Sequence, residues 1–190
     1  RGVPGLRAGA SWYFCNNIGA NSDKLNTYKD YGDIPLRIYT VDAQYTNRYL
    51  TFRGNCIFGN LGKSDKVTSA IKNSGNASPY SRLGPVAKRA VSYGAELGLN
   101  LQGITGCAKC PVLYPFARYE YYNPQEEVIV RQGPDLREQT SMWTAGLNWK
   151  ALPGLIFKAD YTTRKIGGGK FNSENEFAIG VAYVGWFWGK

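Results

Sequence analysis

The chain has 190 residues and a formal net charge of +9, from 23 Lys and Arg against 14 Asp and Glu, and it contains no His. The missing His excludes imidazole metal ligands and Ser-His-Asp triads. Acid-pair and Ser/Asp chemistry do not require His, but the sequence shows no such constellation, so we expect no metal site and no enzyme. The basic residues form no dense run of the kind that nucleic-acid-binding proteins use. No window approaches the ~20 consecutive apolar residues of a transmembrane helix. The 14 Tyr, 5 Trp, 8 Phe and 23 Gly favour strands and turns.

Eight segments alternate apolar and polar residues with a period of two, which predicts strands. In segment 90–101, for example, Val91 and Tyr93 share one face, whereas Ser92 and Glu96 share the other. In chain order the predicted strands span 5–15, 36–46, 48–58, 90–101, 112–122, 140–150, 155–164 and 175–187. We expect them to form a single unit over residues 1–190, with no second domain.

The connections between these segments alternate between long and short, as in outer-membrane β-barrels, where long loops are extracellular and short turns periplasmic. The longest loop, 60–89, contains a predicted helix over 64–73 that Ser64 would cap. This parity places the C-terminus on the periplasmic side. The pattern therefore predicts an all-β fold, a transmembrane antiparallel β-barrel with about eight strands in this chain.

One predicted face of the strands carries aromatic side chains and the other carries charges, which indicates lipid on one side and a water-filled lumen on the other. The aromatic residues of outward parity are Trp12, Tyr39, Tyr93, Tyr119, Tyr121, Trp143, Trp149, Tyr161 and Tyr183. In a membrane protein they would form interfacial girdles. In a soluble ligand-binding β-barrel, the alternative that we consider, they would be core residues.

Charged residues of inward parity are the candidate site. The basic ones are Arg7, Arg53, Arg118, Lys158 and, near the rim, Arg164, and the acidic ones are Asp42, Glu96, Glu120 and Asp160. A basic lumen would lower the entry barrier for anions. The alternative is a cross-strand lattice of ion pairs, since Glu96 and Arg118 lie on adjacent predicted strands.

Cys107 and Cys110 form a C-x-x-C motif in a predicted periplasmic turn, where a small structural disulfide is expected. A zinc site would require all four cysteines of the chain to converge. Cys15 and Cys56 could pair only if the first and third strands approached each other through their loops.

Six strings resemble the C-terminal half of porins of the phosphate-selective porin O and P family, particularly its Bacteroidetes-type members. They are PGLRAGASWYF, YLTFRGNCIFGNL, GAELGLNL, LYPFARYEYYNP, GLIFKADYTTRK and NEFAIGVAYVGWF. The resemblance implies half of a trimeric barrel of roughly sixteen strands. It also implies an N-terminal half, in the same chain or in a separate one. The chain departs from the family in lacking its arginine-ladder motifs and in placing two residues after Trp188.

We therefore expect a bacterial outer-membrane porin whose water-filled channel passes small solutes by diffusion, with a possible preference for anions or phosphate. The expected partners are the lipid bilayer, the missing half of the barrel, further copies in a homotrimer and small anions; no nucleic acid and no cofactor are expected. The alternative is a small closed eight-stranded barrel that acts through its loops as an adhesin or binding protein. An eight-stranded interior is filled by side chains and leaves little channel.

Overall fold

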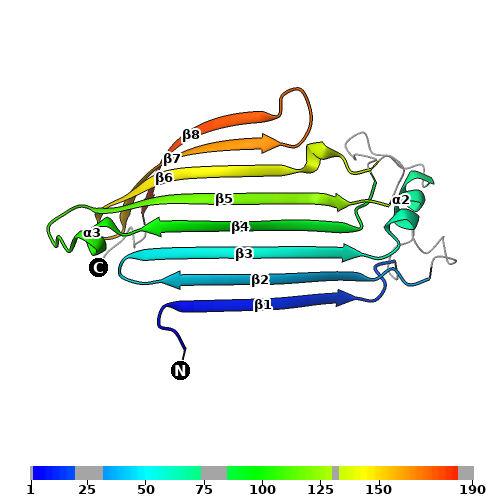
Figure 1. Cartoon of the computed structure of the whole chain (residues 1–190), viewed down its shortest axis with the longest axis horizontal. Coiled ribbons are helices and arrows are strands. Elements are labelled where there is room, and N and C mark those ends of the chain that lie inside the picture. The colour runs from blue at the N-terminus through cyan, green and yellow to red at the C-terminus, as the bar shows by residue number, and fades with distance from the viewer. Residues whose placement is uncertain (1, 20–31, 74–84, 130–132, 184–190) are drawn as a thin grey trace, which may run out of the picture.

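The computed structural model describes residues 2–19, 32–73, 85–129 and 133–183. It is an all-β structure with one antiparallel sheet of eight strands, in which each strand pairs with its neighbours in sequence (Figure 1). The strands are β1 Leu6–Cys15, β2 Leu36–Thr46, β3 Leu50–Leu61, β4 Arg89–Leu99, β5 Val112–Glu127, β6 Thr140–Leu152, β7 Leu155–Ile166 and β8 Ser173–Tyr183. The helices are α2 Ser64–Asn73, α3 Leu101–Thr105 and the short 3-10 helix η2 Leu136–Glu138.

All eight predicted strands are confirmed, with shifted ends. The third begins at Leu50 rather than at 48, because the side chain of Asn47 accepts hydrogen bonds from the backbone N–H groups of Tyr49 and Leu50 and holds a tight turn there. The fourth ends at Leu99, so the prediction that Leu101 belongs to this strand was wrong. Asn100 leaves the sheet to cap α3, in which Leu101 is the first residue. Residues 184–187, predicted as the end of the last strand, lie outside the described residues.

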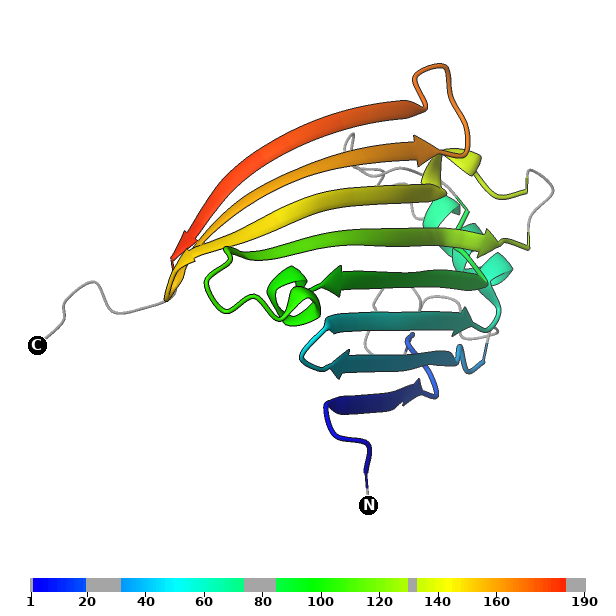
Figure 2. The ribbon, with the colours of Figure 1, turned by 60° about the vertical axis from the view of Figure 1, so that its left-hand side comes forward.

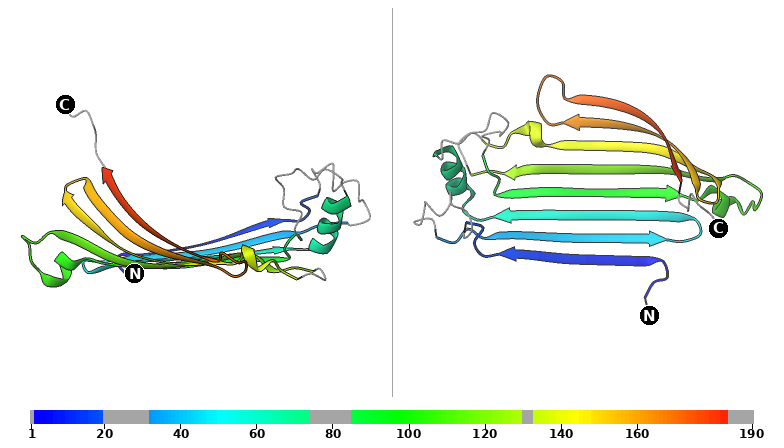
Figure 3. Two further views of the ribbon diagram at one scale, coloured as in Figure 1. Left: turned by 90° about the horizontal axis from the view of Figure 1, so that it is seen from above. Right: turned by 180° about the vertical axis from the view of Figure 1, so that it is seen from behind.

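The sheet is strongly curved, and its last strands bend away from the plane of the first ones (Figures 2 and 3). In the described part of the chain, β1 pairs only with β2 and β8 only with β7. These two strands are therefore the edges of an open sheet. A continuous line of paired residues runs between them, from Leu6 through Tyr45 and onward to Phe177. The register shifts at two strand ends, between Arg89 and Val91 and between Lys150 and Leu152.

The apolar face of this sheet is uncovered. Trp12 is 65% exposed, Trp143 61% and Ile179 75%, whereas the buried apolar residues among those described are Ile34, Val67 and Ala70. A water-soluble domain buries such a face against a second layer of secondary structure. Neither the helices nor the described loops form that layer here (Figure 3).

The polar face is the less exposed of the two. Thr144 on β6 is buried, while its neighbours Trp143 and Ala145, which point to the other side, are exposed. Ser92, Gly94 and Glu96 on β4 alternate in the same way with exposed residues. Because side chains crowd together on the inner side of a bend, we infer that the polar face is concave.

The long connections gather at one end of the sheet, where α2 lies beyond the strand ends on the side towards which β6 to β8 bend (Figure 3). The predicted helix over 64–73 is confirmed, but the capping role of Ser64 was wrong. Lys63 has a φ of 51°, and its carbonyl oxygen accepts hydrogen bonds from the N–H groups of Lys66 and Val67. The helix therefore begins after Lys63, and the Ser64 hydroxyl is buried with no hydrogen-bond partner in the described residues.

The short connections lie at the opposite end, together with α3 (Figures 1 and 2). The Asn100 side chain donates a hydrogen bond to the Arg48 carbonyl oxygen at 3.0 Å and accepts one from the Gly103 N–H at 3.1 Å. A Cβ at Gly103 would collide with that same carbonyl oxygen, so only glycine allows this close approach. The turn between β2 and β3 and the helix α3 are thus locked together. No helix among the described residues is long and apolar enough to cross a membrane.

Candidate functional site

The centre of the concave polar face holds a row of charged residues that come from three adjacent strands. The register places Arg53 of β3 opposite Glu96 of β4, and Glu96 opposite Arg118 of β5. Side chains directly opposite each other in antiparallel strands lie close enough to interact. The local sequence gives each of the three residues the same inward parity, and the register of the three neighbouring strands brings them side by side.

Arg118 is the hub of this row. Its Nη1 lies 3.9 Å from Glu96 Oε2, and its Nε lies 3.0 Å from Oε2 of Glu120, two residues along the same strand. The buried Nε–H is not directed at that oxygen and makes no hydrogen bond with a described residue. A hollow of about 240 Å³ opens over the row and is lined by Arg53, Asn55, Glu96, Arg118 and Glu120 among others.

The remaining predicted residues of this face lie farther apart. Arg7 is opposite Gln44 at the β1 edge, Asp42 is opposite Asn55, and Lys158 and Asp160 are opposite Asn148 and Gly146. Within the described chain, Arg7, Arg53, Asp42, Lys158 and Asp160 form no ion pair. Arg164, near the long-connection end, pairs with Glu174 of β8. The structure thus combines an ion-pair network around Arg118 with separate charges elsewhere.

Uncharged hydrogen bonds extend the polar face towards β7. The hydroxyl groups of Thr144 and Thr162 lie 2.9 Å apart across β6 and β7, in the row that continues from Arg118. Near the other edge, the hydroxyl groups of Ser11 and Thr40 lie 2.5 Å apart across β1 and β2. Hydrogen-bonding and charged side chains therefore occur on this face from one edge of the sheet to the other.

The charges on this face balance. Besides the nine predicted residues, parity and register place Lys150, Glu174 and Glu176 on it. The basic set is then Arg7, Arg53, Arg118, Lys150, Lys158 and Arg164, and the acidic set is Asp42, Glu96, Glu120, Asp160, Glu174 and Glu176. Sequence reasoning missed Glu174 and Glu176 because they lie at the start of the last strand, where parity is harder to read. The net charge of +9 consequently does not come from this face. The electrostatic field close to the face depends on which of its charged residues lack an ion pair.

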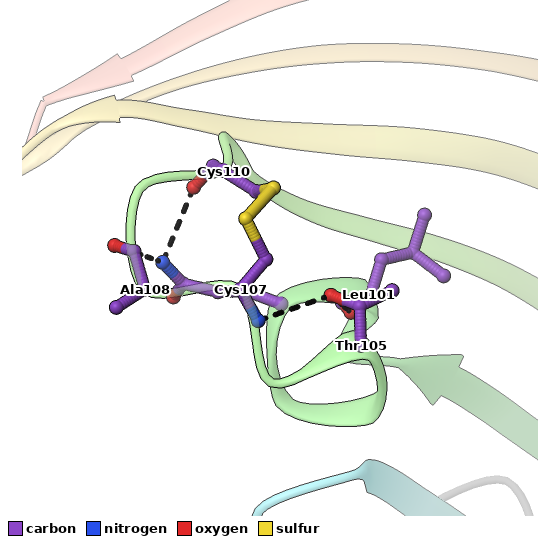
Figure 4. Close-up of a disulfide and its surroundings, with 6 residues drawn as sticks. Leu101, Thr105, Cys107, Ala108 and Cys110 are labelled. Carbon is purple, nitrogen blue, oxygen red and sulfur yellow. Dashed lines mark hydrogen bonds between the residues drawn. A yellow bond between two sulfur atoms is a disulfide. The ribbon is translucent and has the colours of Figure 1, made fainter.

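The C-x-x-C motif follows α3 at the short-connection end (Figure 4). Cys107 and Cys110 form a disulfide with a Cα–Cα distance of 5.4 Å. The Gln102 side chain donates hydrogen bonds to the carbonyl oxygens of Ala108 and Cys110, at 3.3 and 3.2 Å. The motif does not open a helix, as a thioredoxin-like redox motif would. It closes a small loop between α3 and β5.

Cys15 and Cys56 are free and cannot pair with each other. Cys15 has the parity of Arg7 on the polar face, whereas Cys56 has the parity of Phe58 on the apolar face, and β2 lies between their strands. No cluster of His, Cys, Asp and Glu among the described residues could hold a metal ion.

The chain was compared with protein-family models, curated proteins and solved structures, and none of them matches it. The resemblance to porins therefore stays a prediction, and function must be argued from the sheet itself.

Proposed function

We propose that this chain is part of an outer-membrane β-barrel porin, with lipid against its apolar face and a water-filled lumen against its concave polar face. The observation that carries the proposal is a pair of parallel aromatic rows on the uncovered apolar face. The mechanism would be diffusion through the lumen, with no covalent chemistry.

The two rows are six residues apart on four of the eight strands. Four strands carry two aromatic residues six positions apart on the apolar face: Tyr39 and Tyr45, Phe52 and Phe58, Trp143 and Trp149, and Phe177 and Tyr183. Six residues of strand span about 20 Å. The apolar positions between the two rows hold small or aliphatic residues such as Val41, Ala145 and Ile179. Aromatic girdles on either side of an aliphatic band are typical of proteins that cross a bilayer.

Both rows also drift through the register at the same rate. Trp12 of β1 belongs to the row near the long connections, and so does Phe177 of β8, yet the residue of β1 that shares the register of Phe177 is Leu6. From β1 to β8 the aromatic row shifts by six residues along the strands, about 20 Å, while it crosses seven strand spacings of about 4.8 Å. The strands are therefore tilted by about 30° from the perpendicular to the row. Barrel strands are tilted by roughly 35–45° in membranes. A common membrane plane explains the drift, whereas a soluble sheet has no reason to produce it.

The unpaired edges favour a larger barrel over a small closed one. β1 and β8 would have to pair to close eight strands, and in the described residues they do not. We propose that further strands, in the same or another polypeptide, complete the barrel and that copies of it assemble into trimers. Because the charges of the polar face balance, we expect at most a weak preference for anions, due to Arg53 and the other unpaired cations.

The proposal is tested by reconstitution into planar bilayers, with reversal potentials measured in a salt gradient. Stepwise conductance with a weak anion preference would support it. Absence of conductance from the completed barrel would overturn the pore, and a clear preference for cations would overturn the selectivity.

A second experiment distinguishes the small closed barrel. Cysteines are placed in pairs along β1 and β8, in a variant whose Cys15 and Cys56 are replaced by Ser. Intrachain disulfides between β1 and β8 would show that eight strands close on themselves, and the pore proposal would then fail.

A further inference from the structure

A row of polar residues lies on the apolar face, one step beyond the aromatic row at the long-connection end. The register aligns Arg37 of β2, Asn60 of β3 and Arg89 of β4, directly outside the aligned residues Tyr39, Phe58 and Val91. Arg37 and Arg89 are both exposed. Their backbones are two strand spacings apart, about 10 Å, a gap that two arginine side chains can bridge from either side.

A hollow of about 350 Å³ lies beneath this row. It is lined by Tyr39, Phe58, Val91, Arg89 and Glu126, together with Gly59, Asn60 and Ala90. The register places Tyr39, Phe58 and Val91 towards the aliphatic band and Asn60 and Arg89 towards the strand ends. The carboxylate-bearing Glu126 also lines the hollow. The hollow is therefore amphipathic along the direction in which a lipid would lie.

The ion pairs around the hollow leave guanidinium N–H groups available to bind a ligand. Arg89 uses its Nε to pair with Glu127 at 2.9 Å, and Lys88 pairs with the other oxygen of that carboxylate at 2.7 Å. Arg37 places its guanidinium group 5.7 Å from the ring centroid of Phe14 and forms no ion pair in the described residues. Lys88, Arg89 and Arg37 outnumber Glu126 and Glu127. Guanidinium groups bind phosphate oxygens through paired hydrogen bonds.

We propose that this surface binds a lipid with a phosphorylated headgroup, with the phosphate held by Arg37, Asn60 and Arg89 and an acyl chain in the hollow over Tyr39, Phe58 and Val91. The inference rests on the proposed membrane-spanning role of the apolar face. It adds a specific ligand to that face, on the side of the bilayer that faces the long connections.

The test uses the whole protein purified in dodecyl maltoside micelles, with bound lipid counted by native mass spectrometry. Three probes separate the sources of affinity: dioctanoyl phosphatidic acid carries phosphate and chains, dioctanoylglycerol carries chains alone, and inorganic phosphate carries no chain. The variants are Arg37→Gln, Arg89→Gln and their combination. The matched control is Arg48→Gln, which removes the same charge at the opposite end of the sheet.

We expect phosphatidic acid to bind, the double variant to lose affinity at least about tenfold, and Arg48→Gln to stay within about twofold of the parent. Equal binding of dioctanoylglycerol, equal binding of inorganic phosphate, or an unchanged double variant would each overturn the site. Flotation of the same proteins with phosphatidylcholine vesicles distinguishes the lipid site from membrane insertion itself. If the parent protein does not float with the vesicles, membrane insertion is contradicted. If all proteins float but the double variant binds lipid as the parent does, only the lipid site is contradicted.

Discussion

Placing a charge in the middle of the apolar face tests whether lipid covers it. Ala145 lies between Trp143 and Trp149 on β6, about 7 Å along the strand from the first and about 13 Å from the second. It is exposed, and its register neighbours on the same face are Ala117 and Tyr161, so an arginine there meets no steric obstacle. Any large effect of Ala145→Arg must come from its surroundings.

If lipid covers this face, Ala145→Arg should cost about 2–4 kcal/mol of folding free energy, the cost of arginine near the midplane of a bilayer. That is a factor of about 30 to 800 in the folding equilibrium. If water covers it, an exposed surface substitution should change stability by no more than about 0.5 kcal/mol.

Ala178→Arg provides the matched control. Ala178 lies on the polar face of β8 and opposite Asp160, one residue from the register level of Ala145. The same chemical change there should be neutral or stabilising, by up to about 1 kcal/mol, because it creates a cross-strand pair of opposite charges. Both variants are measured by guanidinium titration in phosphatidylcholine vesicles, followed by tryptophan fluorescence. Equal effects of the two substitutions would refute the assignment of lipid and water to the two faces.

Three further predictions concern other parts of the sheet. Arg118→Gln removes the cation that lies beside Glu96 and Glu120, so the reversal potential of the channel should move towards cation preference. An unchanged reversal potential would show that this row of residues does not contact the path of the ions. Gly103→Ala should cost about 1–3 kcal/mol because its Cβ collides with the Arg48 carbonyl oxygen, and increased proteolysis of the loop before β5 should accompany the loss. The comparison variant Gly106→Ala has a positive φ of 68° but no atom near its Cβ, so it measures backbone strain without a collision. The hydrogen bond from Lys88, with the charges of Lys88 and Arg89, lowers the pKa of the Glu127 carboxyl, six residues beyond Tyr121 and outside the aromatic rows. The ionised Glu127 carboxylate should stabilise the protein above pH 4.5, and this contribution should disappear as the pH falls through the lowered pKa. The difference in unfolding free energy between the parent and Glu127→Gln should therefore shrink between pH 6 and pH 3. A constant difference would contradict this ion pair.

The strand order and the two faces were predictable from local sequence. A period of two in segments such as 90–101 reports directly which side chains share a face, and the number of residues between segments limits which strands can be neighbours. The pairing of Glu96 with Arg118 was predictable for the same reason, since it requires only adjacent strands of matching parity. By contrast, the α3 helix within the connection 100–111 was not predicted, because its five residues are too few to show a helical period. Its contact with the Arg48 carbonyl of a different turn is a feature of the tertiary structure.

The alignment of Arg37 and Arg89 could not be predicted from the local sequence pattern. Each has outward parity in the sequence, but their alignment across Asn60 depends on the register of three strands, which long loops separate along the chain. The drift of the aromatic rows depends on register in the same way. That the strands have one apolar and one polar face follows from the amino-acid pattern, because side-chain alternation is a property of each strand alone. Which residues lie side by side, the balance of charges on the polar face and the unpaired edges β1 and β8 of the described sheet follow from the three-dimensional structure, because register and curvature arise from all eight strands together.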